Sequence, residues 1–391
     1  MEQRLGLEAS IAIAEVVGRC DADIVAAYPI TPQTHIVEHL SELVADGELD
    51  AAFVPVESEH SAMSVCCGTA AVGARTFTAT ASQGLALMHE ILFIASALRL
   101  PIVMAVANRS LSGPISIWND HSDVMAERDI GWVQIFAENA QEASDLTIWS
   151  FRLAEDQRVS LPVMMNFDGF ILTHTIEPVL MPDKETVQSF LPRWEPLLKL
   201  DVDDPISMGP VGIPDIYTET KQVQQHLLTK AYDPIVETLD EFGKHFGRKY
   251  KPVETYRADD AEVLLCTMGA LGETAMEAVD RRRKKGQKIG LVRIRLWRPF
   301  PFEDFYRAVG DVPVLGVMDR AISFGGPVGP VASEIKSAFY HREQRPKIVE
   351  FIAGLGGRDV PLSDFDRMFD AIYETAETGK IPAPAIIGLR E

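Results

Sequence analysis

Four segments in the first half of the chain carry polar side chains where a predicted strand ends. They are Thr31, Glu59, the segment from Thr80 through Ser82 and Gln83, and Arg109. One carboxylate, one guanidinium and several small polar groups around a single mouth would suit a small-molecule site. Arg109 could hold a carboxylate in a two-pronged hydrogen bond, and Glu59 could bind a ring nitrogen. A surface glutamate and a surface arginine would look the same in sequence, so these residues alone do not name a reaction.

A loop further along the chain offers possible metal ligands. Asp120, His121 and Asp123 lie within four positions of one another. Three candidate ligands in one loop are a weak signal, and we expect the loop to be held by its own side-chain-to-backbone hydrogen bonds instead. The chain contains no P-loop, no dinucleotide-binding fingerprint and no Gly-x-Ser-x-Gly motif.

The segment Tyr28-Pro29-Ile30-Thr31-Pro32-Gln33-Thr34 joins a predicted strand to a predicted helix. The apolar run at residues 24–28 is typical of a buried strand, and apolar residues recur at helical spacing from residue 36 to residue 44. Thr31 can act as the N-cap, and Pro32 can occupy the first helical position, where its missing N–H costs nothing. We therefore expect a tight strand-turn-helix connection with Thr31 at a helix N-terminus.

The elements that position these segments alternate between strand and helix. We expect strands at residues 24–28, 52–56, 75–80, 101–106, 132–136 and 162–167, and one helix that Ser82 caps and that runs to Leu98. A Pro-rich connection at 175–215 and a helical pair at 216–247 follow, and then strands near 263–266, 289–294, 314–318 and 348–352. The pattern predicts an α/β fold with two doubly wound parallel sheets, whose ligands bind where the strands end.

Composition narrows the range of partners. The chain has 391 residues and a formal charge of −20, which argues against nucleic acid and anionic membranes as partners. No apolar run approaches the roughly 18 residues that a membrane span needs, and the N-terminus lacks the pattern of a signal peptide. We therefore expect a cytoplasmic protein without a membrane span.

The segments described above resemble the alpha subunit of the four-subunit pyruvate:ferredoxin oxidoreductases, in the 2-oxoacid:acceptor oxidoreductase family. The resemblance rests on residues 28–34, 56–62, 80–90, 108–110 and 120–123, and continues at 298–301, 319–320, 323–325 and 354–359. It implies a thiamine-diphosphate pyrimidine-side domain at residues 1–175, an extended connection and helical linker at 176–257, and a transketolase C-terminal-like α/β domain at 258–391.

The resemblance also implies an activity and roles for individual residues. The activity is the oxidative decarboxylation of pyruvate with coenzyme A to acetyl-CoA and CO₂, with electrons passed to ferredoxin, in anaerobic metabolism. Glu59 would bind the aminopyrimidine ring nitrogen of thiamine diphosphate, with Pro29, Ile30, Ser82 and Gln83 as further cofactor-binding residues. Thr31 and Arg109 would bind the substrate carboxylate and keto oxygen. No metal-binding residue is expected in this chain.

Several expected parts of such an enzyme are missing from the sequence. Diphosphate binding in this cofactor class needs a Gly-Asp-Gly segment followed by an Asn, which hold a divalent metal, and Asp168-Gly169 lacks the leading Gly. The four cysteines, Cys20, Cys66, Cys67 and Cys266, have no cluster-binding spacing, and we interpret them as buried small residues. We therefore expect a heterotetramer in which beta, gamma and delta subunits supply the Mg²⁺ and the [4Fe-4S] clusters, and in which the thiamine diphosphate is shared with a partner chain.

Three alternatives remain open at this point. The same chemistry could act on another 2-oxoacid, such as a branched-chain acid, an aryl acid such as phenylglyoxylate, or 2-oxoglutarate; the chain could be a non-catalytic scaffold subunit; or the complex could be a non-oxidative decarboxylase or transketolase-like enzyme. The basic group of Arg293, Arg295 and Arg298 could meet coenzyme A phosphates, although a solvated strand end is the interpretation that we favour.

Overall fold

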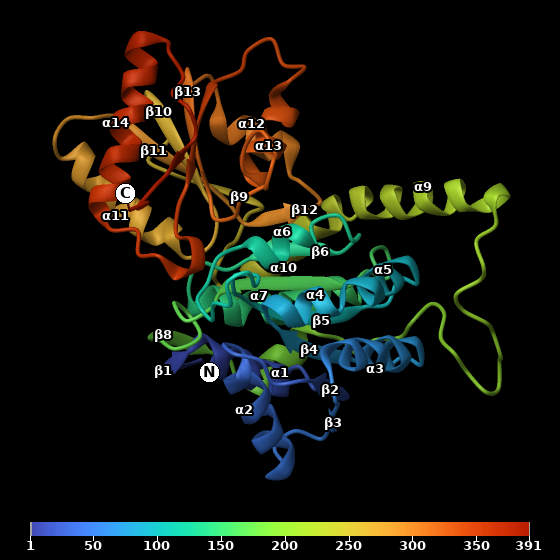
Figure 1. Cartoon of the computed structure of the whole chain (residues 1–391). Helices are drawn as coiled ribbons and strands as arrows, with labels where there is room; N and C mark the ends of the chain where they lie inside the picture. Colours follow the sequence, from blue (N-terminus) through green and yellow to red (C-terminus); the bar gives the residue numbers. More distant parts are fainter. Residues whose placement is uncertain (1, 391) are drawn as a thin grey trace.

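The first half of the chain forms a seven-stranded sheet (Figure 1). The computed structural model describes residues 2–390. The strands follow the order β12-β6-β7-β5-β4-β2-β3; β12 (Leu296–Arg298) comes from the second half of the chain, and all the other strands run parallel. The parallel strands are β2 (Ile24–Ala27), β3 (Ala52–Pro55), β4 (Thr76–Thr80), β5 (Ile102–Asn108), β6 (Val133–Phe136) and β7 (Val163–Asp168). β4, β5, β6 and β7 are buried along their whole lengths, and the apolar run of β5 is typical of such a strand.

Helices cover both faces of this sheet. α1 (Ala9–Arg19), α2 (Thr34–Ala45) and α7 (Ala140–Ala154) share one hydrophobic core, whereas α3 (Glu59–Ala71), α4 (Ser82–Leu87) and α5 (His89–Ala97) contribute to another. Alternate residues of β5 belong to the two cores, with Val103 and Ala105 in the first and Met104 and Val106 in the second. The predicted doubly wound arrangement is therefore confirmed.

Two local predictions are wrong. The helix after the first turn begins at Thr34 with Gln33 as its N-cap residue, so Thr31 does not cap it and Pro32 lies outside it. The side chain of Gln33 holds the turn instead, because its Nε2 donates a hydrogen bond to the carbonyl oxygen of Tyr28 (2.8 Å). The single helix expected from Ser82 is two helices, separated at Met88, and Ala81 is the N-cap residue of the first.

The connection between the two sheets contains more regular structure than we predicted. β8 (Ile176–Met181) pairs with β1 (Gln3–Glu8) in a two-stranded antiparallel ribbon, and α8 (Lys184–Phe190) follows. The chain then has no helix or strand over residues 191–213. The predicted helical pair is present as α9 (Pro214–Lys230) and α10 (Tyr232–Phe246), and α9 projects from the body of the molecule in Figure 1.

The second sheet has six strands in the order β15-β14-β13-β10-β11-β9, and β9 alone is antiparallel to its neighbour. They are β9 (Val253–Tyr256), β10 (Val263–Thr267), β11 (Ile289–Ile294), β13 (Val314–Asp319), β14 (Lys347–Ile352) and β15 (Ala385–Ile386). α11 (Leu271–Arg283) and α14 (Leu362–Thr378) pack in one core, and α12 (Phe302–Val309) and α13 (Pro330–Phe339) pack in the other. A short 3₁₀ helix, η1 (Leu355–Gly357), follows β14.

The two halves of the molecule share one sheet edge. β12 (Leu296–Arg298) leaves the second domain and pairs antiparallel with β6 at the edge of the first sheet. Arg295, just before β12, is 4% exposed and bonds Glu142 of α7 and Glu254 of β9, each at 2.6 Å. Arg293 bonds Glu138 and Glu254 in the same way. The solvated strand end that we favoured for these arginines is therefore wrong, because they are buried or nearly buried ion-pair partners between the domains.

The cysteines and the helix lengths bear on two expectations from composition. Cys20, Cys66 and Cys266 are buried as expected, whereas Cys67 is only half-buried on α3. Within residues 2–390, no helix combines the length and apolar character that a membrane crossing requires.

Candidate functional site

Four adjacent strands bring the predicted site residues to one edge of the first sheet. β5, β4, β2 and β3 are neighbours and run parallel, so their carboxyl ends lie side by side. Two hydrogen bonds confirm the closeness of these ends. Gln33 Nε2 reaches the carbonyl oxygen of Ala79 on β4 (3.4 Å), and Arg109 Nη1 donates to the carbonyl oxygen of Thr31 (2.9 Å).

Glu59 is the first residue of α3 and lies in a confined space. Ser58 caps the helix by accepting a hydrogen bond from the Ser61 N–H (3.2 Å), which fixes the direction in which the next side chain leaves. Glu59 is 6% exposed, and its carboxylate has no hydrogen-bond or ion-pair partner among residues 2–390 that the structure records. The helix N-terminus favours its negative charge. A nearly buried carboxylate without a partner is costly unless a ligand completes it.

Gly84 forms the wall against which Glu59 rests. A Cβ atom at this position would lie 2.6 Å from Glu59 Oε1 and 2.5 Å from Thr80 Oγ1, so no larger residue fits without displacing them. Thr80 Oγ1 is buried and finds no hydrogen-bond partner within the part of the chain that the structure describes. The absence of a Cβ at Gly84 therefore lets both oxygen atoms approach the start of α4 closely.

Arg109 follows β5 and is 6% exposed. Its Nε donates to the carbonyl oxygen of Ser116 (2.7 Å), and its Nη1 donates to that of Thr31, so the side chain ties the first turn to the loop after β5. Burial lowers the pKa of Arg109, but a guanidinium stays charged far above neutral pH. Its other terminal nitrogen, Nη2, has no recorded hydrogen-bond partner in the described chain. The structure therefore brings Arg109 and Thr31 together, as predicted.

The remaining predicted residues lie around this edge with different exposures. Ser82 is buried, and its hydroxyl lies 2.7 Å from the carbonyl oxygen of Ser110 and 2.6 Å from Gln83 Oε1. Gln83 is half-buried and its Nε2 donates to Ser112 Oγ (2.5 Å). Pro29 is exposed and Ile30 is half-buried. Ser82 thus faces the protein interior, whereas Pro29, Ile30 and Gln83 border solvent.

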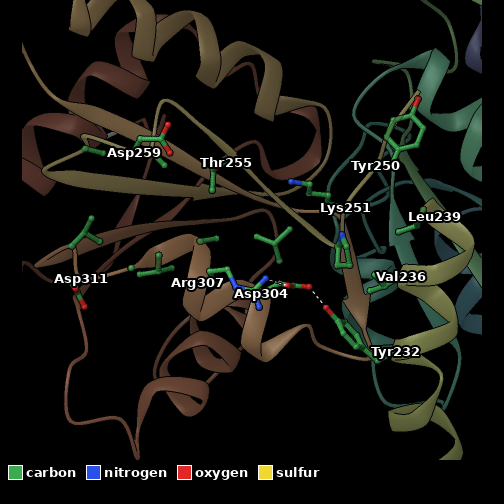
Figure 2. Close-up of a pocket in the computed structure, with 18 of the residues that line it drawn as sticks. Tyr232, Val236, Leu239, Tyr250, Lys251, Thr255, Asp259, Asp304, Arg307 and Asp311 are labelled. Carbon is green, nitrogen blue, oxygen red and sulfur yellow. Dashed lines mark hydrogen bonds and ion pairs between the residues drawn. The ribbon is translucent and has the colours of Figure 1, made fainter. Parts of the chain in front are cut away.

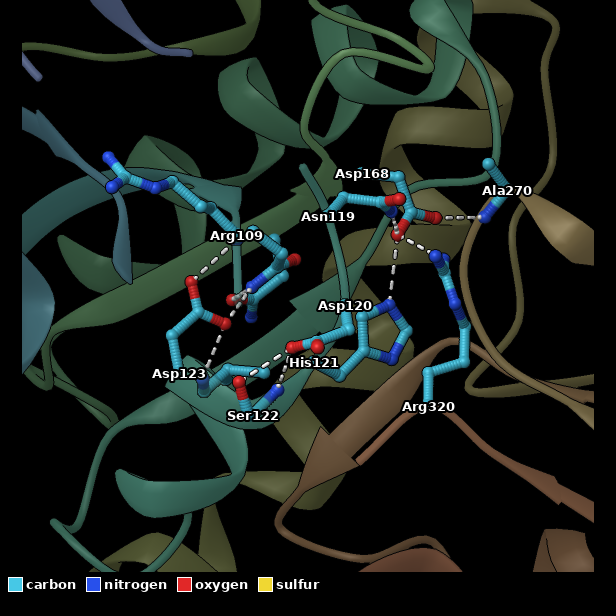
Figure 3. A network of polar contacts seen from close by, with 12 residues as sticks. Arg109, Asn119, Asp120, His121, Ser122, Asp123, Asp168, Ala270 and Arg320 are labelled. Atoms are coloured by element: carbon cyan, nitrogen blue, oxygen red, sulfur yellow. Dashed lines mark hydrogen bonds and ion pairs between the residues drawn. The ribbon is translucent and has the colours of Figure 1, made fainter. Parts of the chain in front are cut away.

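Asp123 fastens the ends of β4 and β5 to the short helix α6 (Ser122–Ala126). Its Oδ2 accepts hydrogen bonds from the backbone N–H groups of Ser82 (3.1 Å) and Arg109 (2.9 Å), as Figure 3 shows in part. Its Oδ1 accepts from Asn108 Nδ2 (3.1 Å) and from the Val124 N–H (2.7 Å). Burial raises the pKa of Asp123 to about 7, while these bonds oppose the shift.

The neighbouring loop residues connect the site to the second domain. Asp120 accepts from the Ser122 N–H (2.9 Å), which is the local hydrogen bonding that we predicted for this loop. The other Asp120 oxygen accepts from the Gly356 N–H (3.0 Å) of η1, so the loop also reaches the second domain. That longer reach is not visible in the spacing of the loop residues.

Asp168, at the end of β7, joins the two domains through a fully buried network (Figure 3). It accepts hydrogen bonds from Asn119 Nδ2 (2.5 Å), from His121 Nε2 (3.0 Å) and from the Ala270 N–H (2.6 Å), and it forms an ion pair with Arg320. Burial alone would raise the pKa of Asp168, but the charge of Arg320 together with the contacts to His121 and the Ala270 N–H outweighs it and holds the pKa well below its usual range. Burial lowers the pKa of His121, while the neighbouring Asp168 carboxylate opposes the shift.

A cavity of about 1080 Å³ lies elsewhere, between α10, β9 and α12 (Figure 2). Tyr232 and Arg307 both bond Asp304 within it. None of the predicted site residues lines it. The cavity is therefore separate from the strand ends where the candidate chemistry lies.

Sequence reasoning missed the residues that act through others. Asp123 was considered only as a metal ligand, and Asp168 only as a metal-binding Asp-Gly pair. Their partners lie on other strands and in the second domain, so no local spacing reveals them. Gly84 was also missed, although a glycine directly after a predicted strand end and helix start is a usable signal of close approach.

Comparisons with known proteins agree with this geometry. Residues 15–238 match the family model described as pyruvate flavodoxin/ferredoxin oxidoreductase, thiamine diphosphate-binding, and residues 261–365 match that of pyruvate:ferredoxin oxidoreductase core domain II. The chain belongs to the pyruvate:ferredoxin oxidoreductase family. Membership was expected from the motifs, and the matched residues now include the whole edge of the first sheet that carries Glu59 and Arg109.

Curated relatives in this family align along nearly their whole lengths. The chain is 47% identical to pyruvate synthase subunit PorA of Pyrococcus horikoshii, with 100% of this chain and 99% of that protein covered. It is 48% identical to the PorA subunit of Methanocaldococcus jannaschii, with 97% and 96% covered. It is also 43% identical to ketoisovalerate oxidoreductase subunit VorA of Pyrococcus abyssi, with 95% and 93% covered.

Solved structures share the fold at low sequence identity. A 2-oxoglutarate:ferredoxin oxidoreductase from Magnetococcus marinus, solved with 2-oxoglutarate, coenzyme A and succinyl-CoA, superposes with a TM-score of 0.73 at 19% identity. The match covers 94% of this chain and 65% of that one. A split-gene transketolase superposes with a TM-score of 0.55 at 11% identity, over 96% of this chain and 99% of that one. Both confirm the two-domain α/β architecture.

Proposed function

We propose that this chain is the alpha subunit of a pyruvate:ferredoxin oxidoreductase and contributes the pyrimidine-side half of a thiamine diphosphate site. The observation that carries the proposal is the nearly buried, unpartnered carboxylate of Glu59, which rests against Gly84 at the same sheet edge as Arg109. Family membership supports the cofactor. Pyruvate is favoured because PorA relatives align at up to 48% identity, against 43% for the VorA relative.

The residues at this edge fit an aminopyrimidine ring. Glu59 offers a carboxylate that can hold a proton at a ring nitrogen, and Thr80 offers a second oxygen that lacks a partner among residues 2–390. Gly84 lets the Glu59 carboxylate lie close to the start of α4. Half-buried Ile30 and exposed Pro29 would border the ring, and Gln83 would bond its edge. Bound thiamine diphosphate would supply a carbanion that adds to the keto carbon of a 2-oxoacid and accepts the charge left when CO₂ departs.

Arg109 and Thr31 are the proposed substrate residues. The Nη2 of Arg109 is free to donate to a carboxylate, while Nε and Nη1 hold the guanidinium in a fixed position. A fixed cation can orient a carboxylate without first losing side-chain freedom. Ser82 faces inward, so its proposed part in cofactor binding is to place Gln83 and Gly84 rather than to touch the ring.

Partner chains would supply the other half of the enzyme. The sequence contains no Gly-Asp-Gly segment and no cluster-binding set of cysteines. We propose that a beta subunit binds the diphosphate through Mg²⁺, that the beta, gamma and delta subunits together carry the [4Fe-4S] clusters and the route to ferredoxin, and that the complex works in the cytoplasm. The subunit naming of the relatives supports a complex of several chains.

Replacing Glu59 by Gln in the complete complex tests the assignment. The amide has the same size but cannot carry the charge or take up a proton, so pyruvate-dependent turnover should fall by about 10²–10⁴ with assembly intact. Turnover is measured as coenzyme A-dependent reduction of a ferredoxin or viologen dye. Glu57→Gln is the matched control, because Glu57 is exposed and bonds only Ser61 Oγ (2.6 Å); its turnover should stay near that of the wild type.

A substrate screen on the same complex separates the remaining alternatives. Pyruvate should give the highest kcat/KM, ahead of branched-chain, aryl and dicarboxylic 2-oxoacids. A clear preference for one of those acids would replace pyruvate but keep the cofactor assignment. Unaltered turnover of Glu59→Gln would make the chain a scaffold and contradict the proposal.

A further inference from the structure

Residues 201–223 form an arm that stands away from the rest of the molecule (Figure 1). Both of its ends are anchored: the Leu200 N–H donates to the carbonyl oxygen of Ala71 (2.7 Å), and Gln224 Nε2 donates to Ser96 Oγ (2.8 Å). Between these anchors lies the first part of α9, and none of the 17 residues of that helix is buried. Met208 packs against the core that contains α3, α4 and α5, but most of the arm has little contact with its own chain.

The arm exposes several apolar side chains between acidic residues such as Asp203, Asp204 and Asp215. Val202 and Val211 are 93% and 86% exposed, and Ile213, Tyr217 and Val223 are each more than half exposed. Single exposed apolar side chains are ordinary, but a series of them along one protruding segment marks a surface that another molecule covers.

The surface of the molecule beside the two anchors has the same character. Residues 61–74 and 76–88 contain no charged side chain, in a protein with a formal charge of −20. Val72 at the end of α3, Leu87 of α4 and Ile94 of α5 are nevertheless 41–52% exposed. Ser64 and Gly68, one turn apart on α3, are exposed too, and a Cβ on Gly68 would meet nothing within 4 Å. A low content of charged residues, compared with the rest of the surface, is typical of the centre of a protein interface.

The position of Glu59 indicates which molecule covers this surface. Glu59 is the first residue of α3, the helix that carries the uncharged surface. The chain that supplies the diphosphate half of the coenzyme site has to approach Glu59 and therefore has to lie near α3. A second copy of this chain would bring another Glu59 and no diphosphate-binding segment, so it could not complete the site from there.

We propose that the arm clasps the beta subunit and holds it against the surface of α3, α4 and α5. The inference rests on the proposed function, because it identifies the partner by the half-site that the partner must supply. The anchors at Leu200 and Gln224 place the arm beside the same helices, so one partner can contact both. The partner surface should offer apolar side chains to the exposed valines of the arm and to the uncharged residues 61–74 of α3 and its C-terminal end.

Placing a charge on the arm tests the proposal. Val202→Glu and Val211→Glu, together in the full chain co-expressed with its partner subunits, should weaken binding of the beta subunit about tenfold or more. The measurement is native mass spectrometry of the tagged complex over a dilution series. Both side chains are almost fully exposed, so the thermal unfolding midpoint of the variant chain should equal that of the wild type.

Ile176→Glu is the matched control, because Ile176 is 71% exposed on β8, at the other side of the first domain in Figure 1. It should assemble like the wild type. The proposal is overturned if the double variant retains its beta subunit, or if it loses only a gamma subunit, a delta subunit or a second copy of this chain. Assembly is read without substrate, so an intact complex that fails to turn over a 2-oxoacid would contradict the proposed function and not the role of the arm.

Discussion

At the first turn of α3, a carboxylate lies against the bare Cα of a glycine. The contact between Glu59 and Gly84 has a cost, because the carboxylate is 6% exposed and has no recorded partner in residues 2–390. An apolar side chain at position 59 would remove that cost. The arrangement is understandable if a ligand that can share a proton occupies the neighbouring space, which is how functional sites come to retain unfavourable groups.

Arg109 differs from Glu59 in being held by its own chain. Two of its nitrogens donate to backbone carbonyls at 2.7 and 2.9 Å, so the guanidinium is positioned before any ligand binds. A lysine keeps the charge but can neither make both of these bonds nor present a fixed donor to a carboxylate. The proposed contact with the substrate carboxylate therefore depends on the fixed position of the Arg109 guanidinium.

We expect Arg109→Lys to lower kcat/KM for pyruvate about tenfold or more, mostly through a higher KM, since the change affects carboxylate binding rather than the coenzyme. Steady-state kinetics of the assembled complex measure it. Arg158→Lys is the control, because Arg158 is exposed and pairs with Asp156 and Glu237 on the surface; its kinetics should be unaltered. An unchanged KM for Arg109→Lys would remove Arg109 from the substrate site.

At the scale of the elements, Asp123 holds two strand ends in register with each other. One of its oxygens accepts from the backbone of both Ser82 and Arg109, so the start of α4 and the end of β5 share a single acceptor. The other oxygen fixes α6 through Val124. The start of α4, where the coenzyme is proposed to bind, and the backbone of Arg109 are therefore coupled through the buried carboxylate of Asp123.

We expect Asp123→Asn to uncouple the start of α4 from the end of β5. The amide keeps one acceptor oxygen and turns the other into a donor, so two buried N–H groups lose their partner, at a cost of about 1–3 kcal/mol in the free energy of unfolding. Because the Arg109 backbone then shifts, KM for the 2-oxoacid should rise as well. Chemical denaturation and steady-state kinetics measure the two effects.

Asp145→Asn provides the comparison for Asp123→Asn. Asp145 is a buried acid of α7 that accepts from Arg248 and Tyr250, and no predicted site residue contacts it. Replacing the Asp145 carboxylate by an amide should lower the free energy of unfolding and leave the KM for the 2-oxoacid unchanged. Equal behaviour of the two variants would mean that Asp123 is structural only.

The elements themselves were largely predictable, and the contacts between them were not. Strand-like runs located every parallel strand of the two sheets except β15, which has only two residues. β12 was missed because it is a three-residue strand whose partner, β6, lies in the other domain. The cap at Thr31 was wrong because the Gln33 side chain, which also reaches β4, holds the turn in place of a helix cap.

In the candidate site, too, the residues were predictable from the sequence and the contacts between them were not. Residue type and strand-end position selected Glu59 and Arg109, and the resemblance supplied their roles. The buried contacts around them depend on tertiary placement. Asp123 reaches strand ends some 14 and 41 positions away, and Asp168 reaches Arg320 across the domain boundary. Such pairs have no signature in a single sequence.

For the whole molecule, the two domains are locked together while one face is left open. The Asp168–Arg320 pair is fully buried, Arg295 bonds elements of both domains, and β12 completes the first sheet from the second domain. The second domain therefore cannot swing away without exposing buried charges. By contrast, apolar side chains around α3, α4 and α5 and on the arm of residues 201–223 remain exposed. Two domains joined by buried contacts, with exposed apolar side chains on one face, suit a subunit that provides half of a shared site.

The most direct measurement is a calorimetric titration of thiamine diphosphate, with Mg²⁺ present, into three samples: this chain alone, its partner subunits alone, and the reconstituted complex. Only the complex should bind the coenzyme tightly, and the Glu59→Gln complex should bind it more weakly or release it. Full-affinity binding by this chain alone, or equal binding by complexes with and without the Glu59 carboxylate, would contradict the claim that Glu59 provides one half of a site that a second chain completes.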